Sequence, residues 1–479
     1  MNCSSELIDG DALRAQFIAS VGKHREQMEA LALRVRDLII PQPPIQLLGY
    51  LLAQFHVACI SNSDENRRLE KGVLQKFQLA LEYAHAVWSC HSPLVDETTQ
   101  FDESMASELF DVLDGLAAAT FTYCLASSAA NLAPEGNRQS ADTEFHAKSA
   151  WSLIRGHRYQ VLEGEFFKYV LEPHADALRQ VYGMEFDAIA DGIQKIADAF
   201  RAGFANAAEQ LFERMEQAYT LAGSTSEALG TVIANLEHLE PSHADELTGY
   251  IQDVFFGGIS NLSRHSTLTE PLLEDLSYQR GENVKFYAEG EYIGTPMRTL
   301  PAREKPGIKL GDQFYATDGQ FIRDSAYRAI QWGLWKRLNY RDEWLRRQAK
   351  IVEQAYPTIF AAQLKGARTY NGVYFRDLQT GNWVETDLLI VLEDVLLVIE
   401  AKAGALPMQS PATNFASHER IIQELIVKAY NQCRRFLEYL ASQSESHIFG
   451  LINGEYIEIT RLRRAAFRRI FPIGLTARC

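Results

Sequence analysis

The stretch Glu385–Lys402, with the sequence ETDLLIVLEDVLLVIEAK, determines how the C-terminal part of this chain is expected to fold. Its pattern predicts two apolar strands joined by a tight turn at Glu393-Asp394. A two-residue turn sets Leu392 opposite Val395, so the numbers of paired residues sum to 787 in the antiparallel ladder. A four-residue loop keeps this register, whereas an odd-length loop breaks it.

The predicted register brings charged side chains together at the open end of the hairpin. Asp387 is expected opposite Glu400, and Glu385 opposite Lys402. Because side chains alternate along a strand, Asp387, Glu400 and Lys402 share one face, and opposed side chains start roughly 4.5–5.5 Å apart. Two carboxylates at that distance repel each other unless a cation lies between them, and Mg²⁺ is commonly held by one or two carboxylates together with substrate phosphates.

The rest of the hairpin is apolar on both faces, which is typical of strands in the middle of a covered sheet. The acidic face is expected to carry Leu389, Val391, Leu396 and Val398, and the other face Leu388, Ile390, Leu397 and Ile399. The charged side chains therefore lie where a buried sheet meets solvent, as in a functional site. The competing interpretation is a solvated hairpin end at which Lys402 neutralises the two acids.

An aspartate on one strand and an acid-x-lysine triplet at the end of the next resemble the PD-(D/E)XK nuclease superfamily. The flanking Glu385-Thr-Asp and Glu400-Ala-Lys-Ala-Gly more closely resemble its nuclease-related-domain and restriction-endonuclease-like branch, although Thr386 replaces the proline of the superfamily's name. The resemblance implies a restriction-endonuclease-like α/β core over residues 336–479, with a mixed sheet flanked by helices. It predicts metal-dependent hydrolysis of phosphodiester bonds in DNA.

The same resemblance assigns roles to the charged residues. Asp387, Glu400 and the backbone carbonyl of Ala401 are the implied ligands of one or two Mg²⁺ ions, for which Mn²⁺ can substitute. Such ions activate water and stabilise the charge that develops on the phosphodiester. Lys402 is expected to act as an ammonium group that positions the water or the transition state, because two nearby carboxylates favour its charged form.

Two predicted helices carry the auxiliary candidates. Glu353 lies on a helix expected over 342–364, and the resemblance makes it an additional ligand; a solvated glutamate is the alternative. Lys428 and Gln432 lie at helical spacing on a helix expected over 417–440. The resemblance directs these two side chains to a phosphate, and an ordinary polar stripe is the alternative.

Five arginines near the C-terminus form a basic cluster that is predicted to track a phosphate backbone, or alternatively to be a solvated basic face: Arg461, Arg463, Arg464, Arg468 and Arg469. Residues 321–479 contain 22 Lys and Arg against 16 Asp and Glu, whereas residues 1–320 contain 25 against 46. The net charge of −15 therefore conceals a basic C-terminal region, and polyanion binding needs only local positive charge.

The remaining sequence predicts three regions. Residues 1–250 show helical spacing and form an all-helical region, a candidate sensor or platform for a protein partner. Residues 251–335 are expected to form a small β-rich adaptor and a connecting helix, from strand-like runs at Val284–Ala288, Tyr292-Ile293 and Gln313–Thr317. Residues 336–479 form the nuclease-like domain, which on the resemblance lacks its final helix.

Composition favours a cytoplasmic protein. Six scattered cysteines without a Cys-x-x-Cys pair predict a reducing compartment, and the N-terminus has no secretory signal pattern. The uncharged run Gly115–Pro134 predicts a buried helix rather than a membrane span. No phosphate-binding loop or dinucleotide fingerprint occurs in the sequence.

The leading hypothesis is a Mg²⁺-dependent DNA endonuclease of defence or repair. The alternative is a catalytically silent scaffold that keeps the nuclease fold and binds partners through its acidic helical region, since a fold does not establish an activity. The intact set of Asp387, Glu400 and Lys402 favours the enzyme. An RNA-directed nuclease is a third hypothesis, for which the sequence offers no aromatic RNA-binding signature.

Overall fold

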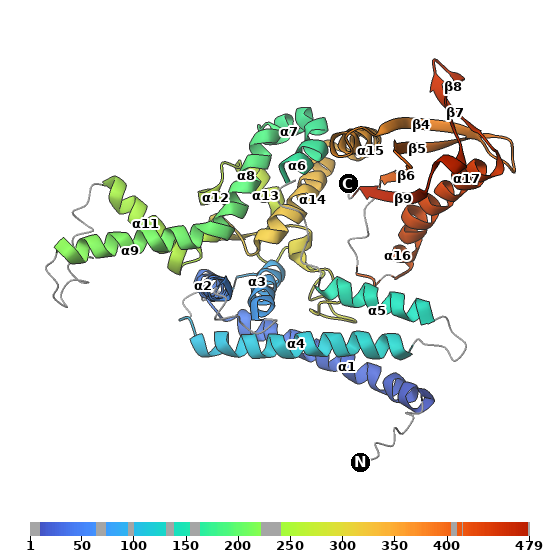
Figure 1. The fold of residues 1–479 in the computed structure, drawn as a ribbon. Helices are drawn as coiled ribbons and strands as arrows, with labels where there is room; N and C mark the ends of the chain where they lie inside the picture. The colour runs from blue at the N-terminus through green and yellow to red at the C-terminus, as the bar shows by residue number, and fades with distance from the viewer. Residues whose placement is uncertain are drawn as a thin grey trace, which may run out of the picture. The chain divides into compact units, whose positions relative to one another are not determined.

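The computed structural model describes residues 10–63, 73–93, 100–130, 138–153, 163–221, 241–403, 410–413 and 415–477. The chain divides into two compact units (Figure 1). Unit 1 comprises Met1–Gly164 and Ala175–Arg337, and unit 2 comprises Glu165–His174 and Leu338–Cys479.

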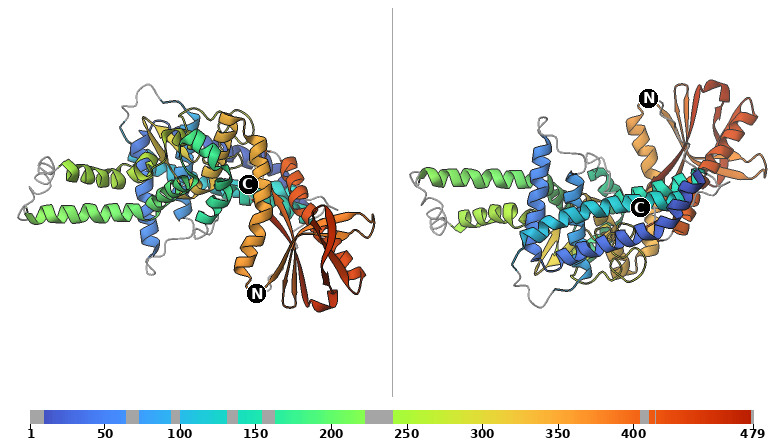
Figure 2. Two further views of the ribbon diagram at one scale, coloured as in Figure 1. Left: turned by 90° about the horizontal axis from the view of Figure 1, so that it is seen from above. Right: turned by 90° about the horizontal axis from the view of Figure 1, so that it is seen from below.

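Unit 1 is built mainly of α-helices. They are α1 (Gly10–Ile39), α2 (Pro44–Ser63), α3 (Val73–Cys90), α4 (Glu103–Ala130), α5 (Arg138–Leu153), α7 (Ala175–Tyr182), α8 (Phe186–Asp198), α9 (Phe204–Leu221), α11 (Pro241–Phe255), α12 (Leu262–His265), α13 (Glu270–Leu276) and α14 (Gly319–Leu338). The break between α1 and α2 coincides with Pro41, Pro43 and Pro44, because proline lacks the N–H that a helix interior needs but is tolerated in a first turn. Helices α9 and α11 lie side by side (Figure 2).

Helix α4 is long and apolar enough to cross a membrane by length and composition, and half of its apolar window is buried. It packs along α1, and its buried residues include Leu109, Leu113 and Leu116. Helix α4 contains the predicted run as far as Ala130, and residues 131–134 lie outside the described residues.

The predicted β-rich region belongs to unit 1 and is only partly β-structure. Strands β1 (Ser277–Tyr278), β2 (Gly307–Leu310) and β3 (Gln313–Ala316) form a small sheet, so the strand predicted at Gln313–Thr317 is confirmed. The strands predicted at Val284–Ala288 and Tyr292-Ile293 are wrong. Those residues form turns, closed by the Gly294 N–H donating to the Phe286 carbonyl, and Tyr292 has a φ of 61°, which a strand does not allow.

Unit 2 is an α/β domain with a mixed six-stranded sheet. Its strands are β4 (Arg368–Arg376), β5 (Trp383–Leu392), β6 (Val395–Ala403), β7 (Ser446–Ile452), β8 (Glu455–Leu462) and β9 (Arg469–Ala477), in the order β8-β7-β4-β5-β6-β9. Among these strands, as far as the described residues extend, only β6 and β9 pair in parallel. The helices are α6 (Glu163–Leu171), α15 (Arg341–Gln363), α16 (Phe415–Ile422) and α17 (Lys428–Ser442), and the turn of π-helix Gln423–Val427 joins α16 to α17. The predicted combination of a helical N-terminal region with a C-terminal α/β domain is thus correct.

The segment Glu165–His174 joins unit 2 through contacts with α15. The His174 and Trp344 rings stack with centroids 3.8 Å apart, and both side chains are fully buried. The Gln348 side-chain amide donates to the Val170 carbonyl at 2.9 Å. Sequence periodicity does not detect such a contact between residues so far apart in the chain.

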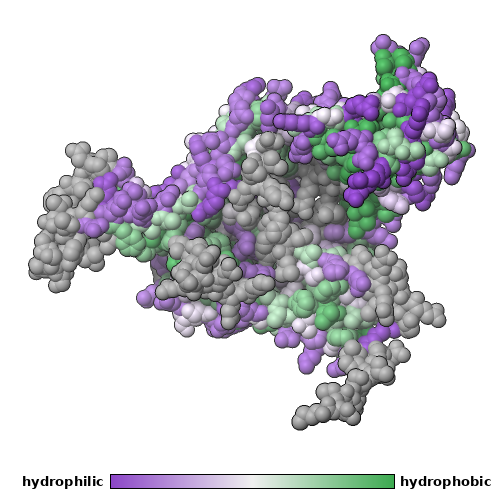
Figure 3. Space-filling view, in the orientation of Figure 1, coloured by the Kyte–Doolittle hydropathy of each residue, from purple (hydrophilic) through white to green (hydrophobic). Residues whose placement is uncertain are grey.

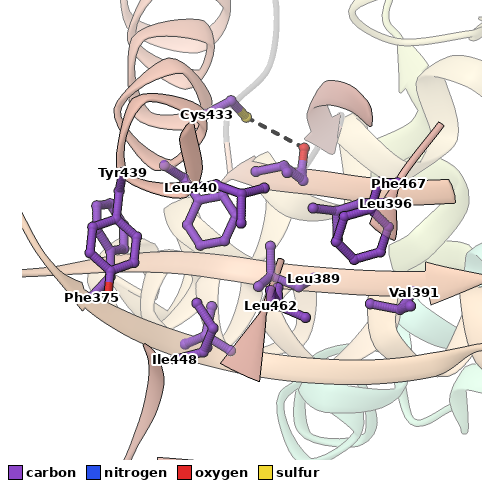
Figure 4. Packing of buried hydrophobic residues seen from close by; sticks show 13 residues of the cluster. Phe375, Leu389, Val391, Leu396, Cys433, Tyr439, Leu440, Ile448, Leu462 and Phe467 are labelled. Atoms are coloured by element: carbon purple, nitrogen blue, oxygen red, sulfur yellow. Dashed lines mark hydrogen bonds between the residues drawn. The ribbon is translucent and has the colours of Figure 1, made fainter. Parts of the chain in front are cut away.

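The central hairpin of unit 2 has the predicted register. The pairs run from Leu392↔Val395 to Leu388↔Ile399, and Glu393 takes the positive φ of 52° that a two-residue turn requires. The two predicted faces are also confirmed. Beneath α17, Leu389 and Val391 of β5 and Leu396 and Val398 of β6 join Phe375, Phe436 and Leu440 in one core (Figure 4). The opposite face carries Leu388, Ile390 and Ile399 against Tyr356 and Phe360 of α15.

Candidate metal centre

The strands β5 and β6 separate just beyond Leu388↔Ile399, and the predicted acidic residues lie at this fork. Past it, β5 continues with β4 through Tyr374↔Glu385, and β6 continues with β9 through Lys402↔Thr476. The expectation that Glu385 lies opposite Lys402 is therefore wrong. The two strands follow different neighbours, so the ladder opens where Asp387 and Glu400 meet.

Glu400 is fully buried from solvent, and its two oxygens have different surroundings. Oε2 accepts a hydrogen bond from the Lys402 ammonium at 3.2 Å, whereas Oε1 has no hydrogen-bond partner in the described structure. Burial and then the negative charge of Asp387 raise the pKa of Glu400 to about 7, against the opposing effect of Lys402. A buried carboxylate oxygen without a partner is costly, so this site is poised to bind a proton or a cation.

Asp387 is held in place by the backbone of the neighbouring strand. Its Oδ2 accepts a hydrogen bond from the Ala401 N–H at 2.6 Å, in place of a regular ladder bond. Asp387 is near enough to Glu400 for its negative charge to raise the pKa of Glu400. Two acidic groups this close together favour the binding of a proton or a cation.

Helix α17 reaches this part of the sheet at its N-terminal end. A Cβ on Gly474, the residue beside Glu400 on β9, would lie 3.3 Å from the Ala429 Cβ. One turn later, the buried Cys433 thiol donates to the Val398 carbonyl at 3.5 Å (Figure 4). Burial and the charge of Glu400 raise the pKa of this thiol to about 11, so it stays protonated.

Lys428 and Gln432 lie on this first stretch of α17. Lys428 is exposed, and Gln432 is half-buried with an Oε1 that has no partner in the described structure. Neither side chain hydrogen-bonds to Asp387, Glu400 or Lys402 among the residues described. Both residues therefore lie on the part of α17 that covers the sheet beside Glu400, and within the described residues neither is hydrogen-bonded to the carboxylates.

Glu353 lies in α15, the helix that covers the opposite face of the sheet, and its side chain lies outside the described residues. Tyr356 and Phe360 of that helix pack on Leu388 and Ile390. The structure therefore gives the helix of the predicted auxiliary ligand but not the direction of its carboxylate.

The arginine cluster does not gather around the carboxylates. Arg469 pairs with Val395 and Arg468 forms an ion pair with Asp394 at 3.4 Å, both at the turn end of the hairpin. Glu400 follows Val395 by five positions along β6, a distance of roughly 17 Å. The first two arginines of the cluster, Arg461 and Arg463, form ion pairs with Glu445, and Arg464 donates to the Phe467 carbonyl.

The donor set of the site is small. Among the described residues, no three His, Cys, Asp or Glu side chains gather as a metal-binding group. The available donors are Asp387, Glu400 with its free Oε1, and the Ala401 backbone carbonyl. Such a set fits Mg²⁺, which usually keeps several waters and takes only one or two carboxylates from the protein.

Comparison with known proteins identifies no relative. No family model, curated protein or solved structure matches the chain. Any functional conclusion must therefore come from the chemistry of the site.

Proposed function

We propose that unit 2 is a divalent-metal-dependent nuclease of the PD-(D/E)XK type that hydrolyses DNA. One observation carries the proposal: a fully buried glutamate has an unpartnered oxygen beside a second carboxylate and a lysine, at the fork of a sheet. A stability role alone does not account for this group, because a buried carboxylate beside another acid destabilises the fold. A metal site accounts for all three residues.

Each residue has a distinct task in this proposal. Asp387 and Glu400 would hold the cation together with the Ala401 carbonyl, and the Ala401 N–H keeps the Asp387 carboxylate oriented. When bound, the cation supplies Lewis acidity and neutralises charge at the scissile phosphodiester. Lys402 is one-fifth exposed, so its ammonium can reach an oxygen of the substrate while it remains paired with Glu400. It then stabilises the charge that develops during attack.

The acidic unit 1 is proposed to regulate or localise this activity by binding a protein partner. Its excess of acidic residues is unfavourable for nonspecific contact with DNA. The arginines at the turn end of the hairpin are proposed to contact phosphates at a distance from the scissile bond, since they lie away from the carboxylates.

The test is cleavage of supercoiled plasmid, linear duplex and single-stranded DNA by the full chain with Mg²⁺ or Mn²⁺. Asp387→Ala and Lys402→Ala are expected to abolish cutting. Asp394→Ala at the turn of the same hairpin and the exposed Lys365→Ala serve as matched controls that should retain it.

Two results contradict the proposal. Cutting that persists in both site variants would assign it to a contaminant or another site. A chain that neither cuts DNA nor binds Mn²⁺ at Asp387 and Glu400 would instead favour the silent scaffold.

A further inference from the structure

Four aromatic side chains gather on the strands next to the proposed metal site. Trp383 stacks on Tyr456 with ring centroids 4.1 Å apart and an interplanar angle of 19°. Phe449 meets Trp383 edge-on at 4.9 Å, and Tyr374 meets Tyr456 at 5.2 Å. The rings come from β5, β8, β7 and β4, so the group spans four neighbouring strands. We call Trp383, Tyr456, Phe449 and Tyr374 the aromatic platform.

The platform lies on the side of the sheet that α17 does not cover. Phe375 points toward α17 and contacts the Phe436 and Tyr439 rings. Its neighbour Tyr374 therefore points to the other side. None of the four platform rings belongs to the buried clusters beneath α17 or α15, and Tyr456 is 37 % exposed. Apolar residues are also exposed on the β7–β8 hairpin (Figure 3), among them Leu451 and Ile457.

The platform shares strand β5 with Asp387 of the proposed metal site. Glu385 pairs with Tyr374 across the β4–β5 ladder and accepts a hydrogen bond from the Tyr374 hydroxyl. Burial raises the pKa of that hydroxyl, and so do the negative charges of Glu385 and of Asp387, which follows Glu385 by two positions on β5. Trp383 precedes Asp387 by four residues, which is roughly 13 Å along a strand.

A positive charge accompanies the rings. The Arg376 guanidinium carbon lies 4.0 Å from the centre of the Trp383 ring, and one of its nitrogens donates to the Gly381 carbonyl. The nearby acid Glu458 is already bonded to His447 at 2.7 Å and to Arg461. Flat aromatic faces beside a guanidinium suit a ligand that presents both rings and phosphates.

We infer that the aromatic platform binds unpaired bases of the DNA strand that enters the metal site. This inference rests on the proposed nuclease function and names its substrate class: DNA with a single-stranded segment. Bases in a duplex have both faces covered by their neighbours, whereas an unpaired base offers a free face to Tyr456, the exposed ring of the platform. Trp383, which lies between Tyr456 and the Arg376 guanidinium, supports the Tyr456 ring. Stacking of this kind tolerates any sequence, because every base has an aromatic face.

The test measures binding of the full chain in EDTA, where no cutting occurs. The probes are a fluorescent single-stranded oligothymidine, a blunt hairpin duplex, and an abasic strand of the same length. Binding is expected to be tightest for oligothymidine. Trp383→Ala and Tyr456→Ala should each weaken that binding by about fivefold to a hundredfold, while duplex and abasic binding change little.

Three controls isolate stacking from folding. Trp383→Phe keeps an aromatic ring and should retain most of the binding. Trp332→Ala removes an exposed tryptophan of unit 1 and should have no effect. Arg376→Gln should weaken all three probes and lower the salt dependence, because it removes a phosphate contact.

The outcomes separate this inference from the proposed function. Equal binding of oligothymidine and the abasic strand, or unchanged binding in Trp383→Ala, overturns the platform even if Mg²⁺-dependent cutting is present. Base-dependent binding that Trp383→Ala abolishes, in a chain that never cuts DNA, supports the platform and overturns the nuclease. Tight binding of an apolar peptide with no binding of any DNA probe would overturn both.

Discussion

Glu400→Gln should stabilise the cation-free protein above pH 7, although it removes a proposed ligand. The pKa of Glu400 rises from 4.5 to about 7 on folding, because burial and Asp387 disfavour its charge. Between these two values the folded state holds a proton that the unfolded state has lost, so stability falls as pH rises. At about 1.4 kcal/mol per pKa unit, the loss is complete above pH 7 and amounts to about 3 kcal/mol. The Glu400→Gln variant avoids this loss of stability, because its amide is neutral and has nearly the same shape as the carboxyl group.

Calorimetry of the full chain in EDTA checks this expectation. Unit 2 has about 150 residues, so 1 kcal/mol corresponds to roughly 2–4 °C in its transition temperature. At pH 8 the variant should unfold at a temperature roughly 6–12 °C higher than the unmodified chain. At pH 5 the unmodified chain has lost only about 1 kcal/mol of stability, so the difference should be roughly 2–4 °C. The exposed Glu455→Gln on β8 is the control and should show no such pH dependence.

Two results would refute the reasoning on Glu400. One is a variant that is no more stable than the unmodified chain at pH 8. The other is a stability difference that stays constant between pH 5 and pH 8, since this would show a packing effect rather than a charge effect. Addition of Mg²⁺ should stabilise the unmodified chain but not Glu400→Gln, because only the former offers the full ligand set.

Further predictions follow from the same geometry. Binding of Mn²⁺, measured by calorimetric titration, should weaken about tenfold for each pH unit below 7, because the proton on Glu400 must leave first; pH-independent affinity would exclude Glu400 as a ligand. Gly372→Ala should destabilise unit 2 by about 1–2 kcal/mol in urea titrations, because Gly372 has a φ of 53° and its Cβ would lie 3.3 Å from Glu385 Oε1. Gly366→Ala, with a φ of 87° and open space around it, gives the backbone effect alone and should cost less. Phe436→Ala should cost about 3–5 kcal/mol as a large-to-small change in the core beneath α17; a cost below 1 kcal/mol would mean that this core is not the one described. Arg468→Gln with Arg469→Gln should reduce the salt dependence of DNA binding without changing the single-turnover cleavage rate, and a large drop in that rate would place these arginines at the site.

The sequence was sufficient to predict the central hairpin because its information is local. Alternating apolar residues on either side of Glu393-Asp394 specify both the register and the two buried faces, and the structure has both. The fork at Leu388↔Ile399 was not predictable in the same way. It depends on the pairing of β6 with β9, whose residues lie about seventy positions later in the chain. For the same reason the partner of Glu385 was predicted wrongly, since that carboxylate belongs with Tyr374 on β4.

The arginine cluster illustrates another limit of sequence. Five arginines close together in the chain suggest one binding surface, yet Arg461, Arg463 and Arg468 form ion pairs with acids and Arg469 is the first residue of β9. Because β9 runs parallel to β6, its first residues lie beside Val395 and its later residues beside Glu400. Strand direction therefore separates basic residues from acidic ones, and composition alone cannot reveal a direction.

A missing pair in the β4–β5 ladder at Gly372 connects the two proposed binding features. The ladder between β4 and β5 has Asn371↔Leu388 on one side of it and Val373↔Thr386 on the other. On the Leu388 side of this irregularity, Leu389 of β5 faces α17. On the other side, Val373 and Phe375 of β4 face α17, so Tyr374 between them faces away. The positive φ of Gly372 allows this change of side opposite Asp387. A regular strand would instead have directed Tyr374 and Trp383 under α17. The local irregularity thus lies opposite Asp387, next to the fork between β5 and β6, and places the aromatic rings on the side that α17 does not cover. A change at Gly372 should therefore weaken Mn²⁺ binding and oligothymidine binding together.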